Sequence, residues 1–207
     1  HFRRKENVIN YLKSFLMNIL VEKMDNILVK KKVEKELSRI KSKKGVYTFI
    51  SKSENYQLVN QEIIRFLSKR MGYSGIYITL NKSHCDTVKK LESNKINTHK
   101  ILFIDAVEDK DGCKAHNCIF VGNRSLTALS LAMSEACKQK AMQYLFFDSV
   151  TTLLIYEKLE TVERFIHFFL NKIKNLNILM IMVSVEEEKT KKIIPILEQF
   201  CDECIRI

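Results

Sequence analysis

Asp148 and Ser149 are the residues whose types and position first suggest chemistry in this sequence. They follow the apolar run 144–147, and the hydroxyl residues Thr151 and Thr152 come shortly after. A carboxylate at the end of a buried strand can hold Mg²⁺ beside a phosphate, because Mg²⁺ prefers oxygen ligands. It can also cap the turn or helix that follows, with the nearby hydroxyls satisfying the same turn. The first interpretation requires a second element in the chain, a loop that binds the phosphate.

The elements that would position Asp148 alternate between strands and helices from residue 45 onward. Short apolar, β-branched and aromatic runs predict strands, and the amphipathic stretches between them predict helices. The expected strands are 45–50, 75–80, 101–107, 118–121, 144–148, 177–185 and 203–207. The expected helices are 55–71, 83–93, 125–141, 161–175 and 188–200. Several strands are apolar on both faces, so the expected fold class is α/β, with a mainly parallel sheet covered by helices on both faces.

Residues 1–44 differ from the rest of the chain and predict a basic, amphipathic helical extension that precedes a domain over residues 45–207. The extension has 13 Lys and Arg against five Asp and Glu, whereas the rest of the chain has 22 against 19. Its apolar residues recur at the spacing of one helical face. They are Val8, Leu12, Phe15 and Ile19, followed by Val29, Val33, Leu37 and Ile40. The residues MDN at 24–26 indicate a break into two helices, the second of which starts at Asp25 or Asn26.

Composition narrows the class of protein. With 207 residues, 46% of them hydrophobic, five Gly and one Pro, the chain fits a globular protein with a buried core rather than a loop-rich or collagen-like chain. Its six cysteines show no disulfide spacing, so the cytoplasm is the expected compartment. No apolar run has the length of a membrane span, and no signal peptide is evident. Since the sequence begins at His1, we expect an excised or tagged piece, and membrane attachment through an upstream segment stays open.

The order and the amino-acid sequences of these segments resemble the RecA superfamily, and more closely its KaiC-like, archaeal RadA-like branch. The resemblance covers roughly residues 45–207, and DSVTTLLIY…RFIHFFL is its most specific part. The segments that carry it are GVYTFI, GIYITL, KILFIDAV, RSLTALSLAMSEA and YLFFDSVTTLLIYEKLETVERFIHFFLNKIKNLNILMIMVSVEEE. The resemblance implies a RecA-like sheet, ATP hydrolysis in active members, and assembly through faces beside the nucleotide. The extension 1–44 has no part in it.

In an active member of this family, the strand 45–50 leads into a phosphate loop of the pattern G-x-x-x-x-G-K-[ST]. Its backbone N–H groups surround the phosphates, its lysine neutralises them and its hydroxyl binds Mg²⁺. This chain has SKSENYQL at residues 51–58, where a count without gaps puts other residues at all four signature positions. Ser51 and Tyr56 replace the glycines, Gln57 replaces the lysine and Leu58 replaces the hydroxyl. A tyrosine side chain stands where backbone must approach a phosphate, and leucine cannot bind a hard cation, so the loop is predicted to be degenerate.

A second catalytic feature of the family is also missing. Active KaiC-like enzymes end the next strand with glutamates that activate the attacking water, whereas this chain has Asn81 and Lys82 there. We therefore expect a non-catalytic regulatory or protein-interaction module on a degenerate ATPase fold. The alternatives are a nucleotide-binding or ATP-hydrolysing protein with a non-standard phosphate loop, and a nucleic-acid-binding, RadA-like protein.

The expected site follows from this interpretation. No catalytic residue, metal site or cofactor is predicted, and ATP with Mg²⁺ is the alternative ligand. If a nucleotide binds, the candidate contacts are Ser51, Lys52, Ser53, Gln57, Asp148 and Ser149. Without a phosphate loop, the capping role is the favoured one for Asp148. Asp105, at the end of another strand, is interpreted as a turn residue in the same way, and the acidic run 186–188 as a solvated helix start.

The expected partners are a protein or a second copy of the chain, bound through residues 1–44 and the RecA-like faces. Nucleic acid or an anionic membrane, bound through the basic residues of the extension, is the alternative. Those residues are Lys30–Lys32, Lys35, Arg39, Lys41, Lys43 and Lys44. We favour a solvated basic face, because the aromatic residues that single-strand binding requires are absent from 26–46.

Two clusters of cysteine and histidine are candidates for a zinc-binding site. Cys201 and Cys204 form a C-x-x-C pair, and Cys113, His116 and Cys118 form a C-x-x-H-x-C cluster. Together the clusters contain enough Cys and His for a four-ligand zinc site. Cysteine is more often simply buried, and nothing in the sequence brings the two clusters together, so packing is the favoured interpretation.

Overall fold

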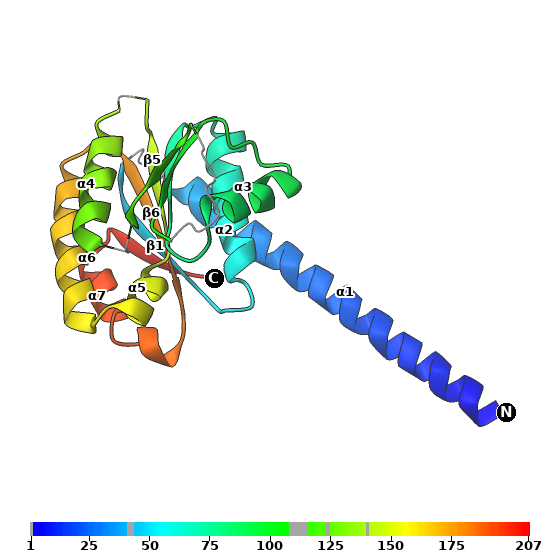
Figure 1. The fold of residues 1–207 in the computed structure, drawn as a ribbon. Helices are drawn as coiled ribbons and strands as arrows, with labels where there is room; N and C mark the ends of the chain where they lie inside the picture. The colour runs from blue at the N-terminus through cyan, green and yellow to red at the C-terminus, as the bar shows by residue number, and fades with distance from the viewer. Residues whose placement is uncertain (1, 41–43, 108–115, 123–124, 140) are drawn as a thin grey trace.

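The computed structural model describes residues 2–40, 44–107, 116–122, 125–139 and 141–207, and for residues 2–11 it describes the backbone alone. Within these residues, seven strands form one sheet in the order β4-β3-β2-β5-β6-β1-β7, with every neighbouring pair parallel (Figure 1). The strands are β1 (Gly45–Ser51), β2 (Gly75–Thr79), β3 (Ile101–Asp105), β4 (Cys118–Phe120), β5 (Tyr144–Asp148), β6 (Leu179–Val185) and β7 (Glu203–Arg206). The predicted parallel α/β sheet is thus confirmed.

Helices cover both faces of the sheet, as predicted. One face carries α2 (Tyr56–Arg65), its π-helical continuation η1 (Phe66–Arg70), α3 (His84–Ser93) and the C-terminal part of α1 (Phe2–Arg39). The other face carries α4 (Leu126–Cys137), α5 (Val150–Tyr156), α6 (Leu159–Lys174) and α7 (Ile194–Phe200). A short 3₁₀ helix, η3 (Glu188–Thr190), precedes α7. Each face has its own hydrophobic core, and the two layers of helices are visible on either side of the strands in Figure 1.

The three strands expected at the centre of the sheet are central. β5 lies between β2 and β6, β1 between β6 and β7, and β3 between β2 and β4. The apolar side chains of β5 point alternately into the two cores, so Leu145 and Phe147 contact one layer of helices while Tyr144 and Phe146 contact the other. A strand apolar on both faces therefore marks a strand buried on both faces.

Helix α1 is one continuous helix of 38 residues, so the predicted break at 24–26 is wrong. Asp and Asn inside a helix cost only up to about 0.7 kcal/mol each, and without Gly or Pro nothing forces a break. Most of the helix projects away from the domain as a single rod (Figure 1). Large apolar side chains between residues 12 and 28 are 49% to 63% exposed, and these are Leu12, Phe15, Leu16, Met17, Leu20, Val21, Met24, Ile27 and Leu28.

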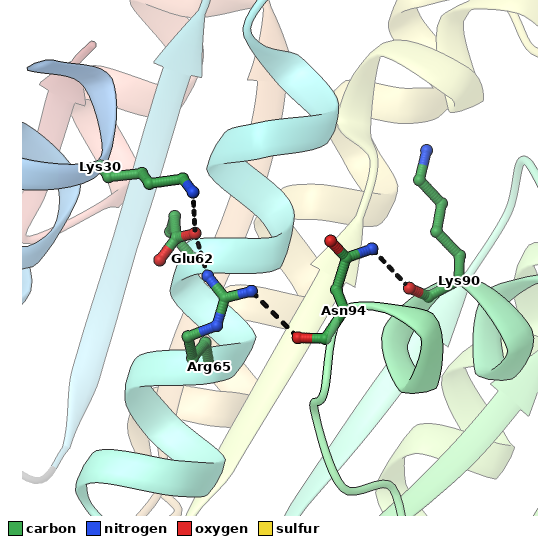
Figure 2. Close-up of polar contacts among 5 residues, drawn as sticks. All are labelled: Lys30, Glu62, Arg65, Lys90 and Asn94. Carbon is green, nitrogen blue, oxygen red and sulfur yellow. Dashed lines mark hydrogen bonds and ion pairs between the residues drawn. The ribbon is translucent and has the colours of Figure 1, made fainter. Parts of the chain in front are cut away.

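The C-terminal part of α1 is anchored on α2. Val33 is fully buried and Leu37 is 4% exposed, both in the core that α2 shares with the sheet. An ion pair of 3.8 Å joins Lys30 to the buried carboxylate of Glu62, which also pairs with Arg65 one turn further along α2 (Figure 2). The predicted second stripe, from residue 29 to residue 40, thus docks on the domain. Of the first stripe, Leu12 and Phe15 remain exposed, and the side chain of Val8 lies outside the described residues.

Two further features differ from the sequence-based expectation. Helix α5, directly after β5, is not among the expected helices, and of the turn or helix left open after Asp148 the structure shows a short helix whose first residues are buried. The expected helix 188–200 is divided into η3 and α7, and Pro195 lies in the first turn of α7, a position that proline tolerates well.

Candidate functional site

Asp148 ends β5, and both of its carboxylate oxygens accept hydrogen bonds from tyrosine hydroxyls. Tyr56, the first residue of α2, donates to Oδ1. Tyr77, in the middle of the neighbouring strand β2, donates to Oδ2 at 2.6 Å. The two tyrosines are 7% and 4% exposed, respectively. The oxygens that would face a metal ion in the Mg²⁺ interpretation are therefore bonded to protein hydroxyls.

Burial shapes the electrostatics of this contact. It raises the pKa of Asp148 to about 7, because the ionised carboxylate is poorly solvated inside the protein. Burial also raises the pKa of Tyr77, and Tyr144 adds to that shift, so Tyr77 keeps its proton and remains a donor at neutral pH. A carboxylate must lose its proton to bind a metal ion. The surroundings of Asp148 oppose that loss.

The predicted capping role belongs to Ser149 and not to Asp148. A cis peptide bond joins the two residues. Ser149 Oγ accepts a hydrogen bond from the backbone N–H of Thr152 at 3.3 Å and so caps the N-terminus of α5. Thr151 Oγ1 in turn accepts from the backbone N–H of Val185 at 2.7 Å, which ties α5 to the end of β6. The hydroxyls after Asp148 thus complete the turn as expected, while the carboxylate has other partners.

The segment at the phosphate-loop position forms a closed turn. The backbone N–H of Asn55 donates to the carbonyl oxygen of Lys52 at 3.1 Å, and that of Tyr56 donates to Ser53 at 3.4 Å. A phosphate loop instead directs its N–H groups at the anion. Ser51 is buried at the end of β1, whereas Lys52 and Ser53 are exposed. Of these three candidate nucleotide contacts, Ser51 is thus withdrawn from solvent, while Lys52 and Ser53 face it.

Gln57, at the position of the phosphate-loop lysine, contacts two lysines of the neighbouring elements. Its Oε1 accepts from Nζ of Lys82, in the loop after β2, at 3.3 Å and from Nζ of Lys90, on α3, at 2.5 Å. Burial lowers the pKa of Lys90, and the nearby Lys82 lowers it further. Sequence reasoning noted Lys82 only as the replacement of a glutamate and missed Lys90. No spacing rule connects these two lysines with Gln57, because the contact forms only when α2 and α3 lie side by side on the sheet.

A small cavity lies between Gln57, the two lysines and Asp148. Its volume is about 20 Å³, which is room for about one water molecule. The other lining residues are Asn60, Gln61, Tyr77, Thr87 and Leu91. Gln57 and Asp148 are thus the two predicted contacts that the fold brings to one cavity.

The sequence of the chain matches the model of a known protein family. Residues 63–207 match the family model described as "ATPase: KaiC". The chain belongs to this family. The matched region begins inside α2, after the segment 51–58, and leaves out α1. The KaiC-like resemblance and the RecA-like fold are thereby confirmed.

A solved structure supports the same fold. The KaiC-like protein PH0186 from the hyperthermophilic archaeon Pyrococcus horikoshii OT3 superposes with a TM-score of 0.52 and 12% sequence identity. The superposition covers 68% of this KaiC-like chain and 61% of that protein. At this identity the similarity concerns the fold. No curated protein sequence matches the chain.

The remaining candidate residues have structural partners. Asp105 Oδ1 accepts from the backbone N–H of Val107 at 2.8 Å and its Oδ2 accepts from that of His84 at 2.6 Å, which confirms its interpretation as a turn residue. The acidic residues after β6 are exposed, and the side chain of Glu187 caps η3. The solvated helix start is likewise confirmed.

The cysteines give no metal site in the part of the chain that the structure describes. Within it, no group of three or more His, Cys, Asp and Glu side chains lies close enough to hold a metal ion, while Cys113 falls outside it. Cys201 and Cys204 are free thiols, and Cys85 is disulfide-bonded, which the sequence-based interpretation did not anticipate. No helix among the described residues has the length and apolar character that a membrane crossing requires.

Proposed function

We propose that this KaiC-like chain does not hydrolyse ATP and acts as a regulatory or protein-interaction module. The observation that carries the proposal is the hydrogen bond from Tyr56 to Asp148. Tyr56 stands at the position of the second glycine of the phosphate loop and binds the carboxylate that would hold Mg²⁺. One residue thus fills the phosphate position and also occupies the candidate metal ligand.

Two further observations support the absence of catalysis. Gln57 replaces the lysine that would neutralise phosphate charge, and its side chain is bonded to Lys82 and Lys90. Asn81 and Lys82 stand where active members have the glutamates that supply the general base.

Purified protein should therefore show neither Mg²⁺-dependent phosphate release nor calorimetric binding of ATP or ADP, with or without Mg²⁺. The matched variant is Asp148→Ala, which removes the candidate metal ligand and should give the same baseline. Turnover in the wild type that this substitution abolishes would show that the chain is an active ATPase and refute the proposal.

The interaction element that we propose is the projecting part of α1, bound to α1 of a second copy of the chain. Met17, Val21, Met24 and Leu28 recur at spacings of four, three and four, which is the spacing of a helix–helix seam. Each is more than 50% exposed. Full burial of such a side chain contributes up to about 1.5–3 kcal/mol, so this seam can stabilise a dimer.

The charges on α1 favour a protein partner over an anionic surface. Asn18, Glu22 and Asp25 lie beside the seam and line a groove next to the turn 52–55, together with Val21 and Leu28. An amphipathic helix that lies on an anionic membrane carries mainly Lys and Arg on its polar face. Between residues 12 and 28, which include the seam, α1 contains only Lys13 and Lys23 as basic residues, and its larger basic groups lie at Arg3–Lys5 and from Lys30 onward.

Sedimentation over a range of protein concentrations tests this element. The wild type should form dimers at physiological salt, and the variant with glutamine at residues 17, 21, 24 and 28 should be monomeric. Changing Lys31, Lys32 and Lys35 to glutamine, as a control, should leave the dimer intact. A monomeric wild type would refute the seam. So would tight binding to DNA or anionic vesicles that the lysine variant loses, because α1 would then be an electrostatic anchor.

A further inference from the structure

Lys82 and Lys90 bring two ammonium groups to one point, and the function proposed above does not use them. Both donate to the same atom, Oε1 of Gln57. Among the ion pairs of the described residues, none involves either lysine. A neutral amide oxygen cannot neutralise two positive charges, so these lysines form a half-buried cationic pair without a counterion among the described residues.

The cavity beside the pair contains unused hydrogen-bonding capacity. Asn60 is 6% exposed, lines the cavity, and has no hydrogen-bond partner for Oδ1 among the described residues. Buried polar groups in proteins are almost always bonded, either to the protein or to a water or ligand. With Thr87 and Gln61 in the same lining, the cavity is polar and has room for one oxygen atom or water molecule.

The carboxyl group that lines this cavity among the described residues, that of Asp148, is hydrogen-bonded to other side chains. Asp148 accepts hydrogen bonds from the hydroxyls of Tyr56 and Tyr77, and burial favours its neutral form. It is therefore a weak competitor for the two ammonium groups. Among the described residues, no carboxyl group that lines this cavity therefore neutralises Lys82 and Lys90.

The walls of the site are held in place by contacts between α2 and α3. Figure 2 shows that Asn94 Nδ2 donates to the carbonyl oxygen of Lys90 at 2.8 Å, while Arg65 of α2 donates to the carbonyl oxygen of Asn94 at 3.2 Å. The side chain of Lys90 extends away from this contact. Its backbone is thus fixed relative to the helix that supplies Gln57 and Asn60.

We propose that Lys82 and Lys90 form a binding site for one phosphate group, supplied by inorganic phosphate or a small phosphate monoester. Two lysines match the dianionic charge of such a group, and each donates charge-assisted hydrogen bonds. One phosphate oxygen fits the cavity near Asn60, and the rest of the ligand lies toward solvent between the half-buried lysines.

Backbone amide NMR during titration with inorganic phosphate, and separately with phenyl phosphate, tests the site at constant ionic strength. We expect saturable shifts at residues that line the cavity, such as Thr87. Lys90→Met should weaken binding by about tenfold or more, since a charge-assisted hydrogen bond is lost. Lys89→Met, an exposed neighbour on α3, is the matched control and should bind like the wild type, as should the conservative Lys90→Arg, which keeps the charge.

Saturation with inorganic phosphate, with phenyl phosphate, or with both supports the site and identifies the source of the phosphate group. Shifts that do not saturate would overturn the proposal. Equal weakening by Lys89→Met and Lys90→Met would overturn it as well, because the effect would then reflect the general positive charge of α3. The spectra of the variants also report directly whether each one is folded.

Discussion

The pH dependence of stability gives the sharpest test of the buried Asp148 carboxyl. The pKa of an aspartate is 3.8 in the reference state, whereas burial raises it to about 7 in the folded chain. Between these two values the folded state binds more protons than the unfolded state. The free energy of unfolding must therefore fall as the pH rises through this window, and the loss is complete above the folded pKa.

The size of this effect follows from the difference in pKa. A shift of one pKa unit corresponds to about 1.4 kcal/mol, so the total loss attributable to Asp148 is about 4 kcal/mol. Part of this loss has already occurred at pH 5, and integration of the linkage relation leaves about 3 kcal/mol between pH 5 and pH 9. The value is an upper bound, because the hydroxyls of Tyr56 and Tyr77 stabilise the ionised carboxylate.

The loss of unfolding free energy due to Asp148 can be measured by urea unfolding at several pH values from 5 to 9 and constant ionic strength, followed by circular dichroism. Asp148→Asn removes it and leaves every other titrating group in place. The difference in unfolding free energy between variant and wild type should therefore shift in favour of the variant as the pH rises. Tyr56→Phe removes a donor to the carboxylate, so it should move the decline to higher pH. Parallel pH profiles of the wild type and Asp148→Asn would show that the reasoning about burial is wrong.

Two other predictions concern the packing that supports the site. Leu37→Ala should lower the free energy of unfolding by about 2–5 kcal/mol, because Leu37 is buried where α1 meets α2, whereas Leu131→Ala, 65% exposed on α4, should change it by less than about 0.5 kcal/mol. Gly75→Ala should cost about 3 kcal/mol or more, because a Cβ there overlaps the ring of Tyr144, while Gly122→Ala meets open space and should be nearly neutral. Urea unfolding of each pair of variants checks both predictions, and equal effects within a pair would contradict them.

The sequence predicts those parts of the fold that depend on local pattern. Strands buried on both faces read as continuous apolar runs, so β5 and its neighbours were placed correctly, and the order of elements indicated the family. The predicted length of α1 was wrong because residues 24–26 resemble a helix cap, although the free-energy cost of Asp and Asn inside a helix is small. Local polarity thus marks where a helix can start, but it does not show that the preceding helix ends.

The contacts of the candidate site could not be predicted in the same way. Tyr56 and Asp148 are 92 positions apart in the chain. They meet only because the C-terminal end of β5 and the start of α2, which follows β1, lie at the same end of the parallel strands. The sequence identified Tyr56 as a residue that blocks a phosphate, but not as the partner of Asp148. No sequence pattern identified Lys90, since its contact with Gln57 depends on the packing of α3 beside α2.

These contacts also explain why restoring single residues of the phosphate loop should not restore catalysis. Tyr56→Gly would supply the missing glycine, yet it would leave Asp148 with one hydroxyl donor fewer in a buried position that already disfavours its charge. Gln57→Lys would supply the missing lysine, yet it would place a third ammonium group beside Lys82 and Lys90 and remove their shared acceptor. Tyr56 and Gln57, which depart from the family pattern, are thus both bonded to other side chains of the site, so the site must change as a unit.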